Sequence, residues 1–149
     1  MYNRSVPEGV TAKGLWMAGK ATAVTNGTQL KNQVKLLGEA SGLIARTEVK
    51  VGRRIWGSIR NIDVVLTNPI TRVTLGIECK FQGGGGSAEE KIPSTIEDIK
   101  AWPIRGIVVI GGSGFSPNMR GYLMSTGMVV DFADLEDWLK LYFGMLDES

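Results

Sequence analysis

The alternation of hydrophobic and polar positions predicts two neighbouring strands in the middle of the chain. Residues 61–66 read Asn-Ile-Asp-Val-Val-Leu, residues 76–82 read Gly-Ile-Glu-Cys-Lys-Phe-Gln, and the turn dipeptide Asn68-Pro69 lies between them. Both segments are rich in β-branched and apolar residues and lack a helical period. We therefore expect two strands joined by a turn, and the rest of the chain to be organised around them.

A helix and a further strand are expected upstream of this pair. Thr28 is a suitable N-cap for a helix over residues 29–40. Its apolar stripe is formed by Leu30, Val34 and Leu37. Residues 43–51 read as a strand, and Gly52 fits the turn of a hairpin that leads to Asp63.

Two possible capping boxes follow the strand pair. Ser87 with Glu90 matches the pattern, and so does Ser94 with Glu97. The second predicts a helix over residues 95–102, which the proline at the next position ends.

The remaining chain alternates strands with helices. Residues 106–110 form a continuous apolar run, which predicts a strand buried on both faces and a parallel crossover before it. Ser116-Pro117 opens a helix over residues 117–125, and residues 128–130 read as a short strand. A terminal helix begins within residues 131–137. Its wide apolar face packs on the sheet or forms a subunit interface, and it consists of Leu135, Trp138, Leu139, Tyr142 and Phe143.

These elements predict an α/β fold in which helices flank a central mixed β-sheet. A chain of 149 residues with 43% hydrophobic residues fits one domain with a real core, so we expect residues 1–149 to form it. Residues 1–26 read as a loose N-terminal arm that contacts DNA or a second subunit, or is a docked or disordered terminus.

Composition excludes several classes of protein. No run of about 18 apolar residues is present and the N-terminus lacks a signal-peptide pattern, so we expect an intracellular, cytoplasmic protein without a membrane span. A single cysteine excludes an internal disulfide and a zinc cluster. The absence of histidine excludes Ser-His-Asp and Cys-His catalysis and nucleases with a histidine base. Any hydrolysis must therefore use carboxylates, lysine and metal.

Charge is unevenly distributed along the chain. The net charge is only +2, but residues 1–82 hold 12 lysines and arginines against 5 acids. This basic half favours a surface that faces a polyanion, although an ordinary solvated surface is the alternative. We expect a DNA-binding cluster, with an edge strand kept soluble by charge as the alternative. It consists of Arg46, Lys50, Arg53, Arg54 and Arg60, with Lys91 as a further phosphate contact.

The candidate chemistry lies on the two central strands. Side chains alternate along a strand, so Glu78, Lys80 and Gln82 share one face while Cys79 faces the other way. Asp63 on the neighbouring strand can lie opposite Glu78. Two carboxylates beside one ammonium group suit a hard divalent cation that activates water next to a phosphate.

The Asp63…Glu78-X-Lys80 pattern resembles the PD-(D/E)XK nuclease superfamily, over about residues 27–138. The resemblance implies a restriction-endonuclease-like core (αβββαβ plus C-terminal additions) and Mg²⁺- or Mn²⁺-dependent hydrolysis of double-stranded DNA to 5′-phosphate and 3′-hydroxyl ends. Asp63 and Glu78 would ligate the ion, with the Cys79 backbone carbonyl as a further ligand. Lys80 would orient or deprotonate water, or stabilise the transition state, and Gln82 would position water or phosphate.

One feature departs from the superfamily's pattern. Its first helix often carries a glutamate that supports the metal site, but the matching positions here hold Gln29, Lys31 or Gln33, and the only acid in the predicted helix is Glu39. A sequence-specific enzyme of restriction or homing type, a Holliday-junction resolvase and a catalytically inactive DNA-binding module all remain open. We expect a homo-oligomer, dimer or tetramer, to supply a second active site.

Overall fold

The computed structural model describes residues 25–53, 59–84 and 88–145. In this part of the chain, strands in the order β1-β2-β3-β4-β5 form one sheet. The strands are β1 (Ile44–Arg53), β2 (Ile59–Thr67), β3 (Thr74–Phe81), β4 (Gly106–Gly111) and β5 (Val129–Asp131). The helices are α2 (Gly27–Ala40), α3 (Ile92–Lys100), α4 (Pro117–Ser125) and α5 (Leu135–Phe143), with short 3₁₀ turns η1 (Ala88–Lys91) and η2 (Phe132–Asp134).

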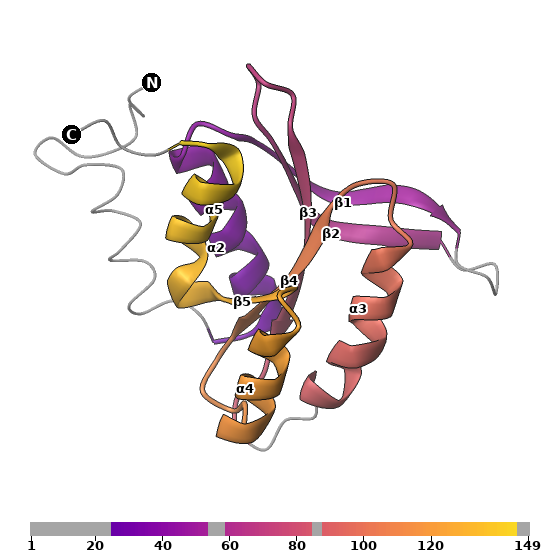
Figure 1. Cartoon of the computed structure of the whole chain (residues 1–149), viewed down its shortest axis with the longest axis vertical. Coiled ribbons are helices and arrows are strands. Elements are labelled where there is room, and N and C mark those ends of the chain that lie inside the picture. Colours follow the sequence, from indigo (N-terminus) through magenta and orange to yellow (C-terminus); the bar gives the residue numbers. More distant parts are fainter. Residues whose placement is uncertain (1–24, 54–58, 85–87, 146–149) are drawn as a thin grey trace, which may run out of the picture.

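The sheet is mixed, as the sequence predicted. β1 pairs antiparallel with β2 and β2 with β3, whereas β3, β4 and β5 run parallel. Helices α2 and α5 cover one face of the sheet and α3 and α4 cover the other (Figure 1). The α/β class, the αβββαβ order and the parallel crossover through α3 are thereby confirmed.

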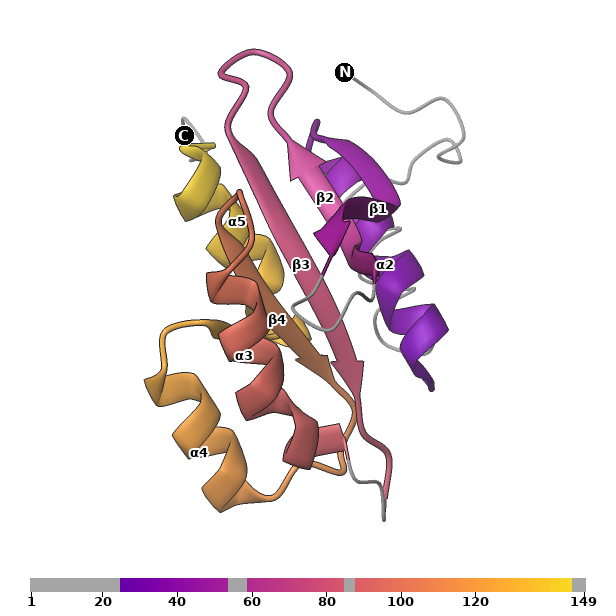
Figure 2. The same ribbon diagram turned by 90° about the vertical axis from the view of Figure 1, so that its right-hand side faces the viewer.

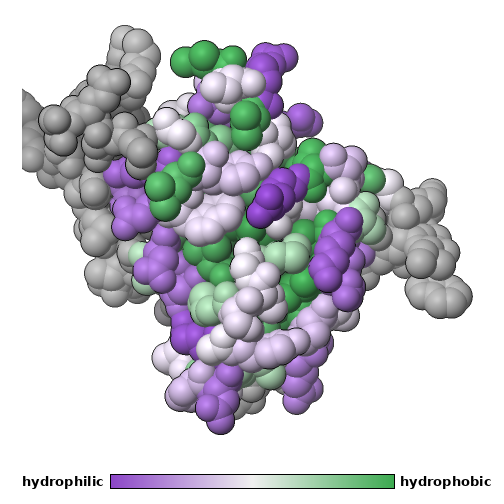
Figure 3. All heavy atoms as spheres, viewed as in Figure 1, coloured by the Kyte–Doolittle hydropathy of each residue, from purple (hydrophilic) through white to green (hydrophobic). Residues whose placement is uncertain are grey.

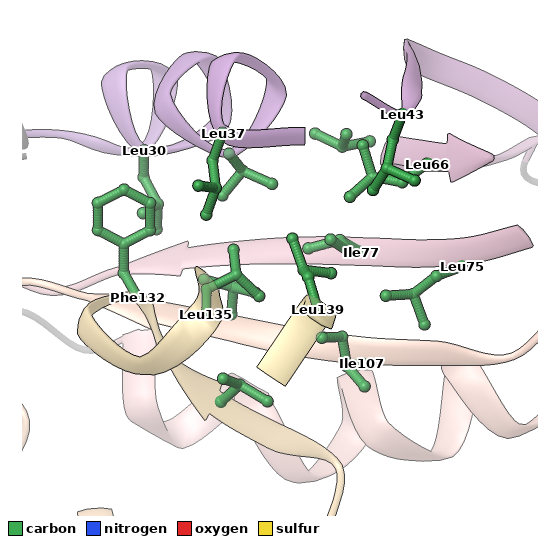
Figure 4. Close-up of a cluster of buried hydrophobic side chains, with 14 of the residues drawn as sticks. Leu30, Leu37, Leu43, Leu66, Leu75, Ile77, Ile107, Phe132, Leu135 and Leu139 are labelled. Carbon is green, nitrogen blue, oxygen red and sulfur yellow. The ribbon is translucent and has the colours of Figure 1, made fainter. Parts of the chain in front are cut away.

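Each face of the sheet holds its own hydrophobic core. In the core beneath α2 and α5, Leu30 and Leu37 point from α2 toward the strands and meet Leu135 and Leu139 of α5 (Figure 4). The core beneath α3 and α4 contains Ile92, Ile96 and Ile99 of α3 with Leu123 of α4. All six residues of β4 are buried, because this strand lies between the two cores.

A tryptophan ring fixes the end of α3 against two glycines of the sheet. A Cβ at Gly76 would lie 2.7 Å from the ring of Trp102, and one at Gly106 would lie 2.5 Å from the same ring. Both positions are paired in register across β3 and β4. Any side chain there would displace the ring, so glycine is what lets α3 end this close to the sheet.

The helix starts differ in two places from the prediction. Asn26, not Thr28, caps α2: its side chain accepts a hydrogen bond from the Gln29 N–H at 2.9 Å. The capping box at Ser94 was also wrong, because η1 and α3 are continuous and the Ser94 hydroxyl donates to the Lys91 carbonyl inside the helix. The other proposed cap, Ser87, lies outside the described residues, as do residues 1–24 of the expected N-terminal arm.

Two predictions in the C-terminal part are confirmed. Ser116 caps α4 by accepting a hydrogen bond from the Met119 N–H. The apolar face of α5 packs on the sheet, and the Tyr142 hydroxyl donates to the Thr74 carbonyl at the start of β3. No helix among the described residues is long and apolar enough to cross a membrane.

The side chains along β1 pack against different cores at the two ends of the strand. Ala45, Val49 and Val51 should share one face of β1. However, Ala45 packs with the core beneath α2, whereas Val49 and Val51 pack with the core beneath α3. The change falls at Glu48, whose φ is +52°. The hairpin therefore turns away from β3 at this point, and Figure 2 shows β2 beside β3 with β1 on its outer side.

Hydrophilic and hydrophobic residues are mixed on the face of the molecule shown in Figure 3. The turn between β2 and β3 forms the upper edge of this face. That turn carries Ile70, which is 88% exposed, and α5 carries Leu141, which is 70% exposed.

Candidate active site

The two central carboxylates meet where β2 and β3 separate. Backbone pairing between these strands ends at Val64 and Ile77. At the next position the Asp63 N–H donates to Glu78 Oε1 at 3.2 Å, and the Cys79 N–H donates to Asp63 Oδ2 at 2.9 Å. The two acids thus replace the backbone hydrogen bonds that the diverging strands no longer make. Each uses one oxygen, and neither second oxygen makes a hydrogen bond within the described chain.

Lys80 lies on the same face of β3 as Glu78. The side chains of Cys79 and Phe81 pack against the core beneath α2, so alternation turns Glu78 and Lys80 toward the α3 side. The ammonium group of Lys80 attracts both carboxylates and lowers their pKa values, although other effects outweigh it. It makes no hydrogen bond or ion pair within the described residues, which leaves its donors available to a substrate.

Burial disfavours the state in which the carboxyl groups of Asp63 and Glu78 are both charged. Desolvation, followed by repulsion from Asp63, raises the pKa of Glu78 to about 7, and Asp98 on α3 adds to the repulsion. Desolvation also raises the pKa of Asp63, against the opposing hydrogen bond from Cys79. An ion-free site near neutral pH therefore holds Glu78 partly protonated, and a divalent cation would favour the form in which both acids are charged.

The donor set fits magnesium rather than a closed metal cage. Among the described residues, no three histidine, cysteine, aspartate or glutamate side chains are grouped so that they could hold a metal ion. Mg²⁺ is commonly bound through one or two carboxylates, with water and substrate phosphate completing its shell. Asp63 and Glu78 match that pattern. The Cys79 thiol does not take part, since it packs against the core beneath α2 and burial raises its pKa well above the usual value.

Gln82 is built into the fold rather than exposed at the site. Its side chain is only 3% exposed, and its amide donates to the Gly114 carbonyl at 2.8 Å. Its backbone N–H donates to Gly111 and its carbonyl accepts from the Gly114 N–H. A Cβ at Gly112 or Gly114 would collide with the main-chain carbonyls of Gln82 and Gly83. The loop after β4 therefore clamps the end of the strand that carries Lys80.

The expected DNA-binding residues are only partly described. Arg46 and Lys50 are exposed on β1, and Lys91 is exposed at the start of α3. The backbones of Arg53 and Arg60 lie in β1 and β2, but their side chains are outside the described part of the structure. Arg54 lies outside it altogether.

Two residues of this region were missed by the sequence analysis of the site. Lys31 of α2 makes an ion pair with Glu48 of β1, with 2.9 Å between Nζ and Oε2. Glu48 falls opposite Asp63 in the β1–β2 register, since Thr47 pairs with Val64. Counting across a hairpin that turns at Gly52 would have set Glu48 against a residue before Asp63, so the predicted hairpin could not locate this position. Glu39, the only acid in the predicted first helix, is exposed. It lies eight residues after Lys31, which is about 12 Å further along α2.

Comparison with known proteins identifies the family. The family model described as "PD-(D/E)XK nuclease superfamily domain" matches residues 12–130. The chain belongs to the PD-(D/E)XK nuclease superfamily. The matched region of this nuclease superfamily domain includes Asp63, Glu78 and Lys80. It also includes β1 to β4 and all of β5 except its last residue, Asp131.

A comparison with solved structures carries no further argument about this chain. A solved chain described as "cryoEM structure DrdV-DNA complex" shares 17% identity and a TM-score of 0.39 with the nuclease superfamily domain, over 68% of this chain. The match spans 10% of that much longer chain. The comparison with curated proteins found no match.

Proposed function

We propose that this superfamily domain is a Mg²⁺-dependent (or Mn²⁺-dependent) DNA endonuclease that hydrolyses phosphodiester bonds in a sequence-specific manner. The observation that carries the proposal is the exchange of hydrogen bonds that brings the Asp63 and Glu78 carboxylates together beside Lys80. One oxygen of each acid makes no hydrogen bond within the described residues, and the same ammonium group attracts both carboxylates. This is the donor set that a hard cation and an attacking water require.

Each residue of the site has a separate role. Asp63 and Glu78 hold the ion, and the Cys79 backbone carbonyl is a further ligand. When bound, the ion lowers the pKa of its water and offsets charge on the phosphate. Lys80 orients this water, or donates to the phosphate oxygens as they gain charge in the transition state. Gln82 acts indirectly: its bonds to the loop after β4 hold the end of β3, and with it Lys80, in place.

The basic residues of the hairpin contact the DNA backbone in this proposal. The residues are Arg46, Lys50, Arg53, Arg54 and Arg60, and Lys91 contacts a phosphate from the start of α3. Each lost phosphate contact lowers the slope of log affinity against log salt by about 0.9 for duplex DNA. Arg46→Gln and Lys50→Gln should therefore weaken binding to all duplex sequences and flatten the salt dependence, as measured by fluorescence anisotropy.

A homo-oligomer completes the proposal, because one site cuts one strand and a double-strand break needs two. The exposed apolar side chains of Ile70 and Leu141 are candidates for the contact. Light scattering at several concentrations tests for the dimer or tetramer, and a mass that stays that of one chain would contradict this part of the proposal.

Cleavage of supercoiled plasmid DNA in Mg²⁺ tests the activity. We expect cleavage with Mg²⁺ or Mn²⁺ and its loss with EDTA. Lys80→Met should slow cleavage by about 10²–10³, the usual cost of removing a transition-state donor, and leave DNA binding nearly unchanged. Lys100→Met is the matched control, because Lys100 is an exposed lysine on α3. Wild-type cleavage by Lys80→Met would refute the assigned role.

The substrate decides which kind of nuclease this is. A sequence-specific enzyme should produce discrete fragments with 5′-phosphate ends from linear duplex DNA. A Holliday-junction resolvase should cut a four-way junction in preference to linear duplex of the same sequence. Binding of duplex without cleavage under every divalent ion tested would identify a catalytically inactive DNA-binding module.

A further inference from the structure

The ion pair between Lys31 and Glu48 crosses from α2 to β1 beside the candidate site. Lys31 Nζ lies 2.9 Å from Glu48 Oε2, and α2 contacts β1, β2 and β3. The lysine side chain is 25% exposed and the glutamate side chain 51% exposed. The hydrogen bond to Glu48 raises the pKa of Lys31, so the ammonium group keeps its charge and its remaining donors over the whole range of ordinary pH.

Glu48 occupies a backbone position that suits glycine. Its φ of +52° lies in the left-handed region, in the middle of β1. The other non-glycine residue with positive φ in the described chain, Arg72, lies in the turn between β2 and β3, where this conformation is common. If the bend in the hairpin were the only requirement at position 48, glycine would meet it with less strain.

The contact with Lys31 does not explain the glutamate as a stabilising group. Half-exposed ion pairs between long side chains contribute little to stability, because solvent screens them and both chains lose rotamer freedom. A strained backbone with a weak, exposed ion pair is therefore a poor arrangement for folding alone. Strained positions of this kind occur often at functional sites.

Lys31 lies within electrostatic reach of the catalytic carboxylate. Lys80 and Lys31 both lower the pKa of Asp63, whereas Glu48 raises it. Lys80 approaches from β3 on the α3 side, and Lys31 from α2 on the opposite side of the sheet. The point where β2 leaves β3 thus has an ammonium group on each side.

We propose that Lys31 is a second substrate-binding cation of the catalytic centre, which contacts a DNA phosphate, and that Glu48 is the residue that positions it. This inference rests on the proposed nuclease function. Of the three donors of the ammonium group, one is used by Glu48, which fixes the direction of the other two.

A double-mutant cycle tests the pair. Lys31→Met should lower the single-turnover cleavage rate about tenfold, below the usual cost of a buried donor because Lys31 is partly exposed. Glu48→Gly should lower it as well, while thermal and urea unfolding show equal or greater stability. If Glu48 acts through Lys31, the double variant should cleave no more slowly than Lys31→Met alone. Lys31→Arg should restore part of the rate. Lys35→Met, one turn further along α2, is the control and should cleave like the wild type.

Binding measurements test the phosphate contact directly. Anisotropy of a labelled duplex in EDTA should show a salt slope lower by about 0.9 for Lys31→Met and unchanged for Lys35→Met. The proposal would be overturned if the rate losses of Lys31→Met and Glu48→Gly multiplied in the double variant. It would also be overturned if Glu48→Gly cleaved DNA at the wild-type rate. A third contradicting result would come from calorimetry, if Glu48→Gln bound Mn²⁺ more weakly than Lys31→Met does. Glu48 would then act on the ion and not through Lys31.

The outcomes also separate this inference from the proposed function. If the wild type does not cleave DNA in Mg²⁺ or Mn²⁺, both fail together. If the wild type cleaves and Lys80→Met does not, while Lys31→Met and Glu48→Gly both cleave normally, only the role of the Lys31–Glu48 pair is refuted.

Discussion

Replacing Glu78 by glutamine removes a costly buried charge and keeps the shape of the side chain. The pKa of this carboxyl is 4.5 in the unfolded chain, and burial raises it to about 7 in the folded one. The folded state therefore binds this proton more tightly. The neutral carboxyl contributes stability below pH 4.5, and that contribution is lost as the pH rises to about 7.

The size of the effect follows from the two pKa values. A difference of about 2.5 pH units, at about 1.36 kcal/mol for each, gives an upper limit of about 3 kcal/mol. Solvent reaches part of Glu78, so we expect about 1–2 kcal/mol of the free energy of unfolding to depend on this group. Glutamine cannot ionise, and its carbonyl can still accept the hydrogen bond from the Asp63 N–H. The Glu78→Gln variant should therefore be more stable than the wild type at pH 8 and similar to it at pH 5.

Urea denaturation in EDTA at pH 5 and pH 8 measures this difference. Trp102 and Trp138 both pack against the cores, so their fluorescence reports unfolding. Glu97→Gln is the control, because Glu97 is an exposed acid on α3 whose replacement should leave the pH dependence of stability unchanged. If wild type and Glu78→Gln lose the same stability between pH 5 and pH 8, the carboxyl is not titrating as the burial argument requires.

Other consequences are open to direct measurement. Ion binding should release close to one proton near pH 6.5, because the two acids must both be charged; calorimetry in buffers of different ionisation enthalpy measures it, and zero release would refute the coupling. Gly106→Ala should destabilise the fold by about 1–3 kcal/mol, since the new methyl group meets the ring of Trp102. Gly121→Ala, in open space on α4, should instead stabilise it by about 0.5–1 kcal/mol in thermal unfolding. Gln82→Leu should cost about 1–3 kcal/mol, because the Gly114 carbonyl loses its donor, and it should slow cleavage without weakening DNA binding.

The parts of the fold that rest on local patterns were predictable from sequence. The apolar run of β4, the cap at Ser116 and the apolar faces of α2 and α5 each follow from residues close together in the chain. The meeting of Asp63 and Glu78 followed from strand alternation and one turn. Local pattern was sufficient here because α2 and α5 each bury one apolar face, whereas β4 is buried on both faces and is apolar throughout.

The features that were missed depend on contacts between distant segments. Gln82 was expected to face substrate, but the loop that buries it lies 32 residues further along the chain. The left-handed backbone at Glu48 has no local signal either, because the residue type disfavours it and the bend is imposed by the two cores. The position of a helix cap shifted by two residues at Asn26, a common difference when several capping residues adjoin.

The hydrogen bonds between the two side chains and the diverging strands limit which substitutions evolution can tolerate at positions 63 and 78. Asp63 and Glu78 each accept a hydrogen bond from a backbone N–H of the other strand, so a lineage that no longer cut DNA would still need an acceptor at both positions, either the acid or its amide. Lys80 carries no comparable structural duty within the described chain. Descendants that have lost catalysis should therefore be recognised by substitution of the lysine, with aspartate or asparagine still at position 63 and glutamate or glutamine still at position 78.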